Sequence, residues 1–156
     1  MSAEFNTDII KFSSIAIRNA TVDNNTDLHK IDKSSYNHDI KFDFTPAIST
    51  KEERVRINFS AEIETFKILE DGREKIDINS KFEIEYYYKI DDFEKYVFRD
   101  ENKIDSQLLV VLSSLAYSTS RGIIFAKCQG TILSDMVIPV VSNNKLVDYL
   151  VGNTDE

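Results

Sequence analysis

The sequence predicts an α+β fold in which a four-stranded antiparallel sheet is followed by one long helix and a short second helix. Alternating apolar and polar residues recur in four segments before residue 91, with no helical period between them. A helical period begins near residue 105 and returns briefly near residue 146. Strands followed by helices in this way are typical of α+β proteins. We expect one domain over residues 1–156, because this length fits a single core.

The first two predicted strands are separated by a polar segment. Apolar residues alternate with polar ones over residues 10–12 and again, in the opposite phase, over residues 15–17, so we expect a bulge near Ser13. The next segment is rich in Asn, Asp, Thr and Ser and predicts an exposed loop. We expect the second strand to run from Tyr36 to Pro46 and to end there, because proline cannot donate to a sheet ladder.

Two longer strands follow, joined by Asp71-Gly72, a pair that readily adopts the positive φ of a tight hairpin turn. The third strand covers residues 55–68, and its apolar phase changes near Thr65, where we expect another bulge. The fourth strand alternates strictly over residues 76–90. Consecutive strands without intervening helices favour antiparallel pairing, and the alternation predicts that one sheet face is core and the other solvated.

The long helix is predicted to begin at Asp105 or Ser106, either of which can cap it, and to end near Gly130. Residues 108–112 are all apolar and cover more than one helix face, whereas a surface helix of a monomer needs an apolar stripe of roughly 100°. We therefore expect the sheet to cover one side and a second copy of the chain to cover the other. Alternatively, the loops and the last helix cover it within one chain. The residues expected between copies are Leu108, Val111, Leu112, Leu115 and Tyr117.

Composition and charge argue against several kinds of partner. The chain has 27 acidic and 19 basic side chains and a net charge of −8, which repels phosphate backbones and anionic lipids. We expect neither nucleic acid nor a membrane as partner, and the longest apolar run, residues 108–112, is short of the ~20 residues that a span needs. Residues 1–7 show no secretory signal and the single cysteine fits a reducing compartment, so we expect a cytoplasmic protein.

The residues show no pattern typical of catalysis, and we expect no enzyme activity, no cofactor and no metal. The only histidines, His29 and His38, lie in or beside the polar loop. Cys128 is predicted near a helix C-terminus, which raises rather than lowers a thiol pKa. None of the four glycines forms a phosphate-binding motif. Glu83 and Glu85 share the polar face of the fourth strand, where we expect them to be solvated and available to a basic partner.

One stretch carries a family resemblance. The residues from Leu112 to Gly122 read LSSLAYSTSRG and are followed by Ile138-Pro139-Val140-Val141 and a short apolar helix. This pattern resembles the C-terminal half of SecB-like export chaperones, which have a long helix ending in Ser-Arg-Gly, a proline-containing loop and a second helix. The interval from Gly122 to Pro139 is longer than in the common SecB pattern, so the chain is similar to divergent members, some of which protect an antitoxin from aggregation.

The resemblance implies a tetramer made as a dimer of dimers and an ATP-independent holdase for unfolded or nascent polypeptides, with protein export as one possible setting. SecA and an antitoxin are further candidate partners. Clients would lie in grooves bordered by the sheet, the crossover loop and the second helix, where aromatic and Met side chains adapt to varied sequences. The candidate client-binding residues, each with core packing as the alternative, are Tyr36, Phe42, Phe44, Phe66, Ile68, Tyr86, Tyr88, Ile132, Leu133 and Met136.

Two other functions are weighed against a general chaperone. A dedicated interaction module, such as a chaperone with one antitoxin as client, is barely separable from a holdase by sequence. A hot-dog-like thioesterase or dehydratase also wraps a sheet around a long helix, but it needs Asp, Glu or His on that helix as general base. Residues 108–126 contain none of these, which argues against the enzyme.

Overall fold

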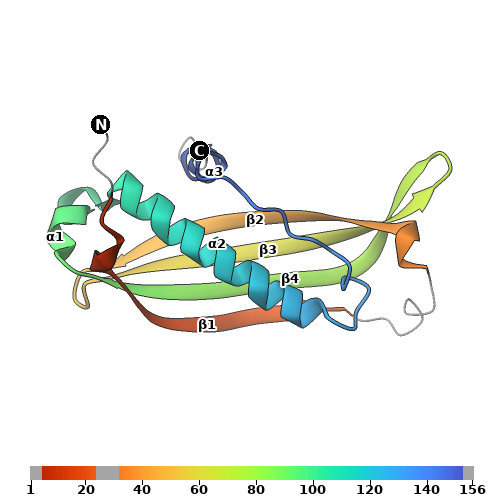
Figure 1. Ribbon diagram of the computed structural model, residues 1–156, viewed down its shortest axis with the longest axis horizontal. Coiled ribbons are helices and arrows are strands. Elements are labelled where there is room, and N and C mark those ends of the chain that lie inside the picture. Colours follow the sequence, from red (N-terminus) through yellow and green to blue (C-terminus); the bar gives the residue numbers. More distant parts are fainter. Residues whose placement is uncertain (1–4, 24–31, 153–156) are drawn as a thin grey trace.

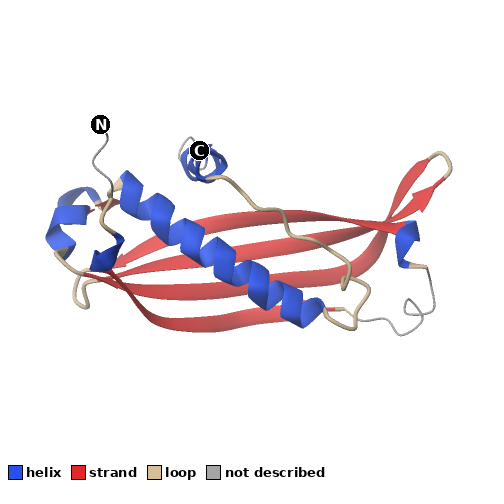
Figure 2. Cartoon of the chain, viewed as in Figure 1, coloured by secondary structure: helices blue, strands red, loops and turns tan. Residues whose placement is uncertain are grey.

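The computed structural model describes residues 5–23 and 32–152, and four antiparallel strands form its main sheet in the order β1-β4-β3-β2. Helix α2 crosses one face of this sheet diagonally, and α3 lies near β2 (Figures 1 and 2). The predicted fold class and element order are confirmed, while residues 24–31 of the predicted loop lie outside the described part. The main elements are β1 (Ile10–Val22), β2 (Tyr36–Ser49), β3 (Arg54–Leu69), β4 (Gly72–Ile90), α2 (Ser106–Cys128) and α3 (Asn143–Gly152).

Several short elements were not predicted, because two to four residues are too few to show a period. Between β4 and α2 the chain forms a one-turn helix and a small two-stranded sheet, visible at the end of the molecule where α2 begins (Figure 1). These elements are α1 (Phe93–Tyr96), β5 (Val97–Phe98) and β6 (Lys103–Ile104), with 3-10 turns at Thr7–Ile9, Lys33–Ser35 and Arg99–Glu101.

The bulge expected in the first strand is confirmed. The pairing of β1 with β4 shifts between Phe12 and Ser14, and an unpredicted second shift follows between Ile17 and Asn19. Directly paired residues of antiparallel strands lie on the same sheet face. Because the β4 partners of Phe12, Ile15 and Ile17 are core residues, all three side chains lie on the face that carries α2.

The irregularity expected near Thr65 is also present, but the extra residues are on the other strand. In the β3–β4 ladder, Ile63 pairs with Ser80 and Thr65 pairs with Ile76. The additional residues therefore lie on β4, between Ile76 and Ser80. The expected end of the second strand at Pro46 is wrong. Strand β2 continues through this proline to Ser49, which is possible because β2 is an edge strand and proline is tolerated where no ladder bond is required.

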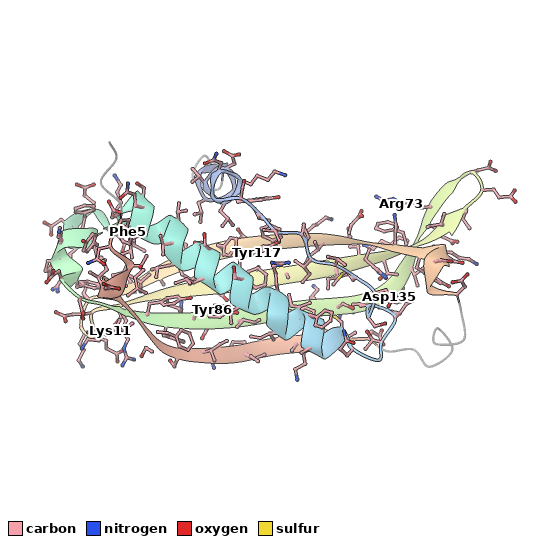
Figure 3. The ribbon with its side chains drawn as sticks, in the orientation of Figure 1. Phe5, Lys11, Arg73, Tyr86, Tyr117 and Asp135 are labelled. Carbon is pink, nitrogen blue, oxygen red and sulfur yellow. The ribbon has the colours of Figure 1, made fainter. Side chains whose placement is uncertain are left out.

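The core lies between the sheet and α2. The Asp105 side chain accepts hydrogen bonds from the backbone N–H groups of Gln107 and Leu108 at 3.0 and 3.1 Å, which confirms the predicted cap. Beneath the helix, the hydroxyls of Tyr86 and Ser120 share a hydrogen bond of 2.6 Å, and Tyr86 lies where α2 crosses the sheet (Figure 3). The fully buried large side chains are Ile57, Phe59, Ile63, Phe82, Ile84, Tyr86, Ile90, Leu108, Leu112, Ile124, Leu133 and Leu146.

Length and composition alone would allow α2 to cross a membrane. This differs from the expectation based on the short uninterrupted apolar run. The serines and the tyrosine between the apolar residues of α2 lower the mean hydropathy of the helix only slightly. In this fold, however, Leu112, Ala116 and Ile124 of α2 are buried in the core. The core helix of a soluble protein has the same length and composition, so α2 by itself is weak support for a membrane segment.

The opposite face of the sheet is charged and tied together by ion pairs. Glu64 of β3 lies between Lys41 of β2 and Lys75 of β4, with N–O distances of 2.8 and 2.5 Å. The hydrogen bonds from Lys41 and Lys75 lower the pKa of Glu64 from 4.5 to about 2. Three strands are therefore joined through one carboxylate.

We expect Glu64→Gln to flatten the acid limb of the stability curve. A carboxyl group with a depressed pKa in the folded chain adds stability above its unfolded pKa, and this contribution is lost as the pH falls from about 4.5 to about 2. Urea unfolding measured across this range should therefore show a shallower pH dependence for the variant. Glu62→Gln serves as the control, since Glu62 makes a longer 3.6 Å contact with Lys81. Equal slopes for Glu64→Gln and the unchanged chain would contradict the prediction.

Candidate functional site

Helix α2 retains apolar side chains on the side that faces away from the sheet. Leu115 is 44% exposed and Phe125 is 59% exposed, whereas Leu112, one turn before Ala116, is fully buried. The loop after α2 and helix α3 cover one flank of the helix through Leu133 and Leu146. One copy of the chain therefore hides part of the apolar circumference of α2 but leaves its outer side open.

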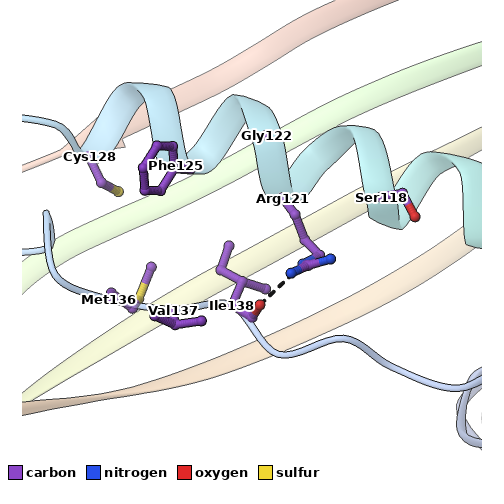
Figure 4. A pocket seen from close by; sticks show the side chains of 8 residues that line it. All are labelled: Ser118, Arg121, Gly122, Phe125, Cys128, Met136, Val137 and Ile138. Atoms are coloured by element: carbon purple, nitrogen blue, oxygen red, sulfur yellow. Dashed lines mark hydrogen bonds between the residues drawn. The ribbon is translucent and has the colours of Figure 1, made fainter.

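A groove lies between the C-terminal half of α2 and the loop that follows this helix, and we call it the α2–loop groove (Figure 4). It has a volume of about 360 Å³ and most of its surface is apolar. Helix residues form one wall and loop residues form the other. The lining residues are Ser118, Arg121, Gly122, Phe125, Cys128, Met136, Val137 and Ile138.

Two side chains of α2 hold the loop in place. The Arg121 Nε group donates a hydrogen bond of 3.1 Å to the carbonyl of Ile138 (Figure 4). The Tyr117 hydroxyl donates one of 2.9 Å to the carbonyl of Pro139. Both acceptors belong to the proline-containing segment of the loop. The groove is therefore a formed feature of the fold, since its two walls are joined by specific hydrogen bonds.

The chemistry of the groove suits an apolar side chain better than a reaction. Burial raises the pKa of the Cys128 thiol to about 11, so the sulfur is protonated at neutral pH and a poor nucleophile. Val137 is 83% exposed at the rim, and Phe125 presents its ring from the helix. Within residues 5–23 and 32–152, no group of His, Cys, Asp and Glu side chains is arranged to hold a metal ion.

An aromatic cluster lies beside the groove and joins β2, α2 and α3. The ring of Phe42 is 5.0 Å from that of Tyr117 and 4.8 Å from that of Tyr149, measured between centroids. Phe44 and Phe59 complete the cluster from the sheet. Contacts of this kind stabilise beyond simple burial, so the cluster fixes α3 against the edge of the sheet.

The predicted client-binding residues fall into different environments, and only Met136 lines the groove. Six of them are buried in the core, where they cannot contact a client while the fold is intact; for these the core-packing alternative applies. They are Tyr36, Phe44, Tyr86, Tyr88, Ile132 and Leu133. Phe42, Phe66 and Met136 are half-buried and Ile68 is exposed. Phe66 and Ile68 belong to the end of β3 that pairs with β4 in the hairpin that extends past the sheet (Figure 1).

The residues predicted between copies divide in the same way. Leu108, Leu112 and Tyr117 pack in the core of their own chain, so in one copy they are not at a surface. Val111 is half-buried and Leu115 is exposed on the outer side of α2. The reason is that a run of five apolar residues points both inward and outward, and the pattern does not say which side faces the sheet.

The two acidic residues proposed for a partner also differ. Glu83 is exposed, whereas Glu85 accepts hydrogen bonds from the Arg18 guanidinium at 2.9 Å and from the Tyr87 hydroxyl at 2.7 Å. The hydrogen bonds from Tyr87 and Arg18 lower the pKa of Glu85. Its charge is therefore already matched within the chain and is less available to a basic partner.

Sequence reasoning missed an apolar stripe on β1. Phe12, Ile15 and Ile17 are exposed, although they lie on the same sheet face as α2. Strand β1 is an edge strand, so these side chains form an uncovered margin of the core face. The bulge was the available signal in the sequence, because it places Ile10 and Phe12 on the same sheet face as Ile15 and Ile17. The alternation of apolar and polar residues could not show that α2 leaves this margin uncovered.

Comparisons with known proteins identify the fold. No protein-family model and no curated protein sequence matches the chain. A solved structure does match: the Mycobacterium tuberculosis Rv1957 SecB-like chaperone, in complex with a ChAD peptide from the Rv1956 HigA1 antitoxin. The two structures align with a TM-score of 0.59 over 86% of this chain and 91% of the other, at 10% sequence identity. The chain therefore has the SecB-like fold that its long helix, proline-containing loop and short helix suggested.

Proposed function

From this SecB-like fold, we propose that the chain is a non-enzymatic chaperone that holds unfolded polypeptide in the α2–loop groove without ATP. The observation that carries the proposal is apolar surface left open on a formed groove, with Phe125 on one wall and Val137 on the other. Exposed apolar surface of this kind marks a contact site. An unfolded client offers what the groove fits, which is an apolar side chain on an extended backbone.

Self-association is part of the proposal and rests on the outer side of α2. Val111, Leu115, Ser118, Gly122 and Phe125 recur at intervals of four and three residues, the spacing of a seam between two packed helices. We call these five residues the α2 seam. Ser118 and Gly122 are small, which lets a second helix approach closely. A second copy packed on the seam would cover Leu115. Because Ser118, Gly122 and Phe125 also line the α2–loop groove, the second copy and a client would compete for this wall of the groove.

The groove is tested by a matched pair of substitutions in the loop. Val137→Asp puts a charge where an apolar client side chain would bind, and we expect it to lose most of the protection that the unchanged chain gives to an aggregating, chemically unfolded client, measured by light scattering. Val140→Asp is the control, since Val140 is 80% exposed in the same loop but does not line the groove. Equal protection by both variants would contradict the role of the groove, and no protection by the unchanged chain at molar excess would contradict the function.

A chaperone dedicated to one client is the second candidate. It is favoured by the solved neighbour, which was captured with a peptide from an antitoxin. Affinity capture from the native host separates the two forms, since one dominant, saturable partner supports a dedicated chaperone and a broad set of nascent chains supports a general one. The proposal includes no step with SecA.

A further inference from the structure

Another pocket lies on the charged face of the sheet, opposite the face that carries α2. It forms where β2 ends and β3 begins, at the end of the sheet near α1 (Figure 1). Arg54 and Arg56 alternate with core residues of β3, and Arg56 pairs directly with Tyr87 of β4, so all three side chains point away from α2. The pocket has a volume of about 210 Å³. We call it the arginine pocket, and it is bordered by Ala47, Ile48, Glu52, Arg54, Arg56 and Tyr87.

The two arginines use few of their N–H groups within the chain. Each guanidinium group carries five donors. Arg54 donates from Nη1 to the Glu52 carboxylate at 3.3 Å, while Nη1 of Arg56 lies 3.7 Å from Glu85, beyond hydrogen-bond length. The Nε groups of both arginines are buried and have no acceptor among the described residues. Because native proteins rarely leave buried donors unpaired, these two groups indicate that an acceptor from outside the chain completes the pocket.

The charge of the pocket favours an anion as that acceptor. Glu85 does not neutralise Arg56, because its carboxylate accepts closer hydrogen bonds from Arg18 and from the Tyr87 hydroxyl, at 2.9 and 2.7 Å. Glu52 is then the one carboxylate beside two guanidinium groups. The chain as a whole has a net charge of −8, but salt screens distant charges beyond about 8–10 Å, so the nearby arginines dominate.

The remaining walls of the pocket are apolar. Most of its surface is apolar, and Ala47, Ile48 and the ring of Tyr87 provide it. The hydrogen bond from the Tyr87 hydroxyl to Glu85 holds this ring in place. A hydrated inorganic ion gains nothing from apolar walls, whereas a carbon group attached to the anion is removed from water. The volume is below the roughly 300–1,000 Å³ of pockets for drug-sized ligands, so the ligand that fits is small.

We propose that the arginine pocket binds a small organic anion, in which a carboxylate or phosphate group is joined to an apolar group. The guanidinium groups of Arg54 and Arg56 suit both oxyanions, because their planar array of N–H donors can meet two oxygen atoms at once. The apolar group of the ligand packs against the ring of Tyr87. This site goes beyond the proposed function, since the α2–loop groove lies on the opposite face of the sheet.

The first test keeps the chain unchanged and varies the probe. Benzoate and benzamide have nearly the same shape, but only benzoate is charged. Phenyl phosphate and inorganic phosphate share an oxyanion, but only phenyl phosphate has a ring. In ligand-observed NMR titrations, we expect benzoate to bind at least about tenfold more tightly than benzamide, and phenyl phosphate at least about tenfold more tightly than inorganic phosphate.

Each pair of probes has a result that contradicts the proposal. Equal binding of benzoate and benzamide, or no binding of any probe, would overturn the anion site. Equal binding of phenyl phosphate and inorganic phosphate would overturn the role of the apolar walls. Tighter binding of benzoate supports a carboxylate as the natural ligand, and tighter binding of phenyl phosphate supports a phosphate ester.

The second test removes one charge from the pocket. Arg56→Gln keeps a polar side chain but lacks the guanidinium group, and we expect it to bind the tighter anion at least about tenfold more weakly than the unchanged chain. Arg73→Gln is the matched control, because it makes the same change in net charge at the other end of the sheet, where Arg73 pairs with Asp39 (Figure 3). Circular dichroism confirms that both variants are folded. Equal losses in the two variants would show that only net charge matters and would overturn the site.

A third variant separates this site from the α2–loop groove, which also contains an arginine, Arg121. Val137→Asp lies in the groove and should leave the affinity for the anion unchanged, although it is expected to lose client protection. If Val137→Asp weakens anion binding as much as Arg56→Gln does, the probe binds in the groove and the inference is overturned. Failure of the arginine pocket would leave the proposed function standing, because client protection does not depend on it.

Discussion

Gly122→Gln is expected to lower the mass of the assembly in solution to that of a smaller species while the single chain remains folded. Gly122 lies in the α2 seam, and a Cβ built on it would meet nothing within 4 Å. Its backbone is helical, so no positive φ requires glycine there. Packing within one chain thus gives no reason for glycine at this position, whereas close approach of a second helix does.

The two effects of this substitution have opposite signs, which makes the test sharp. Glutamine is a better helix former than glycine by up to about 1 kcal/mol, so the single chain should be as stable as before or more stable. A bulky side chain in the seam, by contrast, separates the two helices. Mass measurement by light scattering after gel filtration checks the result, and circular dichroism confirms the fold.

Lys127→Gln is the control, since it introduces the same side chain on the same helix but outside the seam. The Lys127→Gln variant should form an assembly of the same mass as the assembly of the unchanged chain. A wild-type mass equal to that of one chain at all concentrations would remove the basis for self-association. An unchanged mass for Gly122→Gln would show that the copies meet elsewhere, with the exposed β1 stripe of Phe12, Ile15 and Ile17 as the next surface to test.

Leu112→Ala is expected to cost about 2–5 kcal/mol of the free energy of unfolding, the usual range for a buried leucine truncated to alanine. Leu112 has no exposed surface and packs in the core between α2 and the sheet. Leu115→Ala removes the same atoms from a side chain that is 44% exposed in one chain. In the isolated chain its cost should remain near or below about 1 kcal/mol.

The comparison requires a background in which assembly does not contribute, because association stabilises the folded state by mass action. Both substitutions are therefore made in the Gly122→Gln chain and measured by urea unfolding. A large difference between Leu112→Ala and Leu115→Ala is the expected result. Equal costs in this background would show that one chain covers Leu115 by itself, and the α2 seam would lose its physical basis.

Much of the fold follows from local patterns in the sequence. The strict alternation of β4 predicts a strand with one buried face, because side chains of a strand alternate between faces. Asp105 predicts the start of α2 because its carboxylate can accept from the free N–H groups of the first turn. Asp71-Gly72 predicts the hairpin, and Gly72 indeed has a positive φ of 146°. Each of these signals acts over a few residues.

The candidate site depends on contacts that no local pattern contains. Tyr86 and Phe125 are both aromatic, yet Tyr86 is buried beneath α2 and Phe125 lines the open groove. Which of them is covered depends on the angle at which α2 crosses the sheet and on the path of the following loop. That path is set by Arg121 and Tyr117 through hydrogen bonds to carbonyl groups distant in the sequence.

The sequence by itself determined the four long strands and the two main helices, their order, the face of each strand that is buried and the excess of apolar surface on α2. Only the tertiary structure decided which part of that surface remains uncovered and where the groove forms. The physical reason is that the apolar periodicity of strands and helices and the chemistry of turns depend on neighbouring residues, whereas the exposure of a side chain depends on the packing of the whole chain.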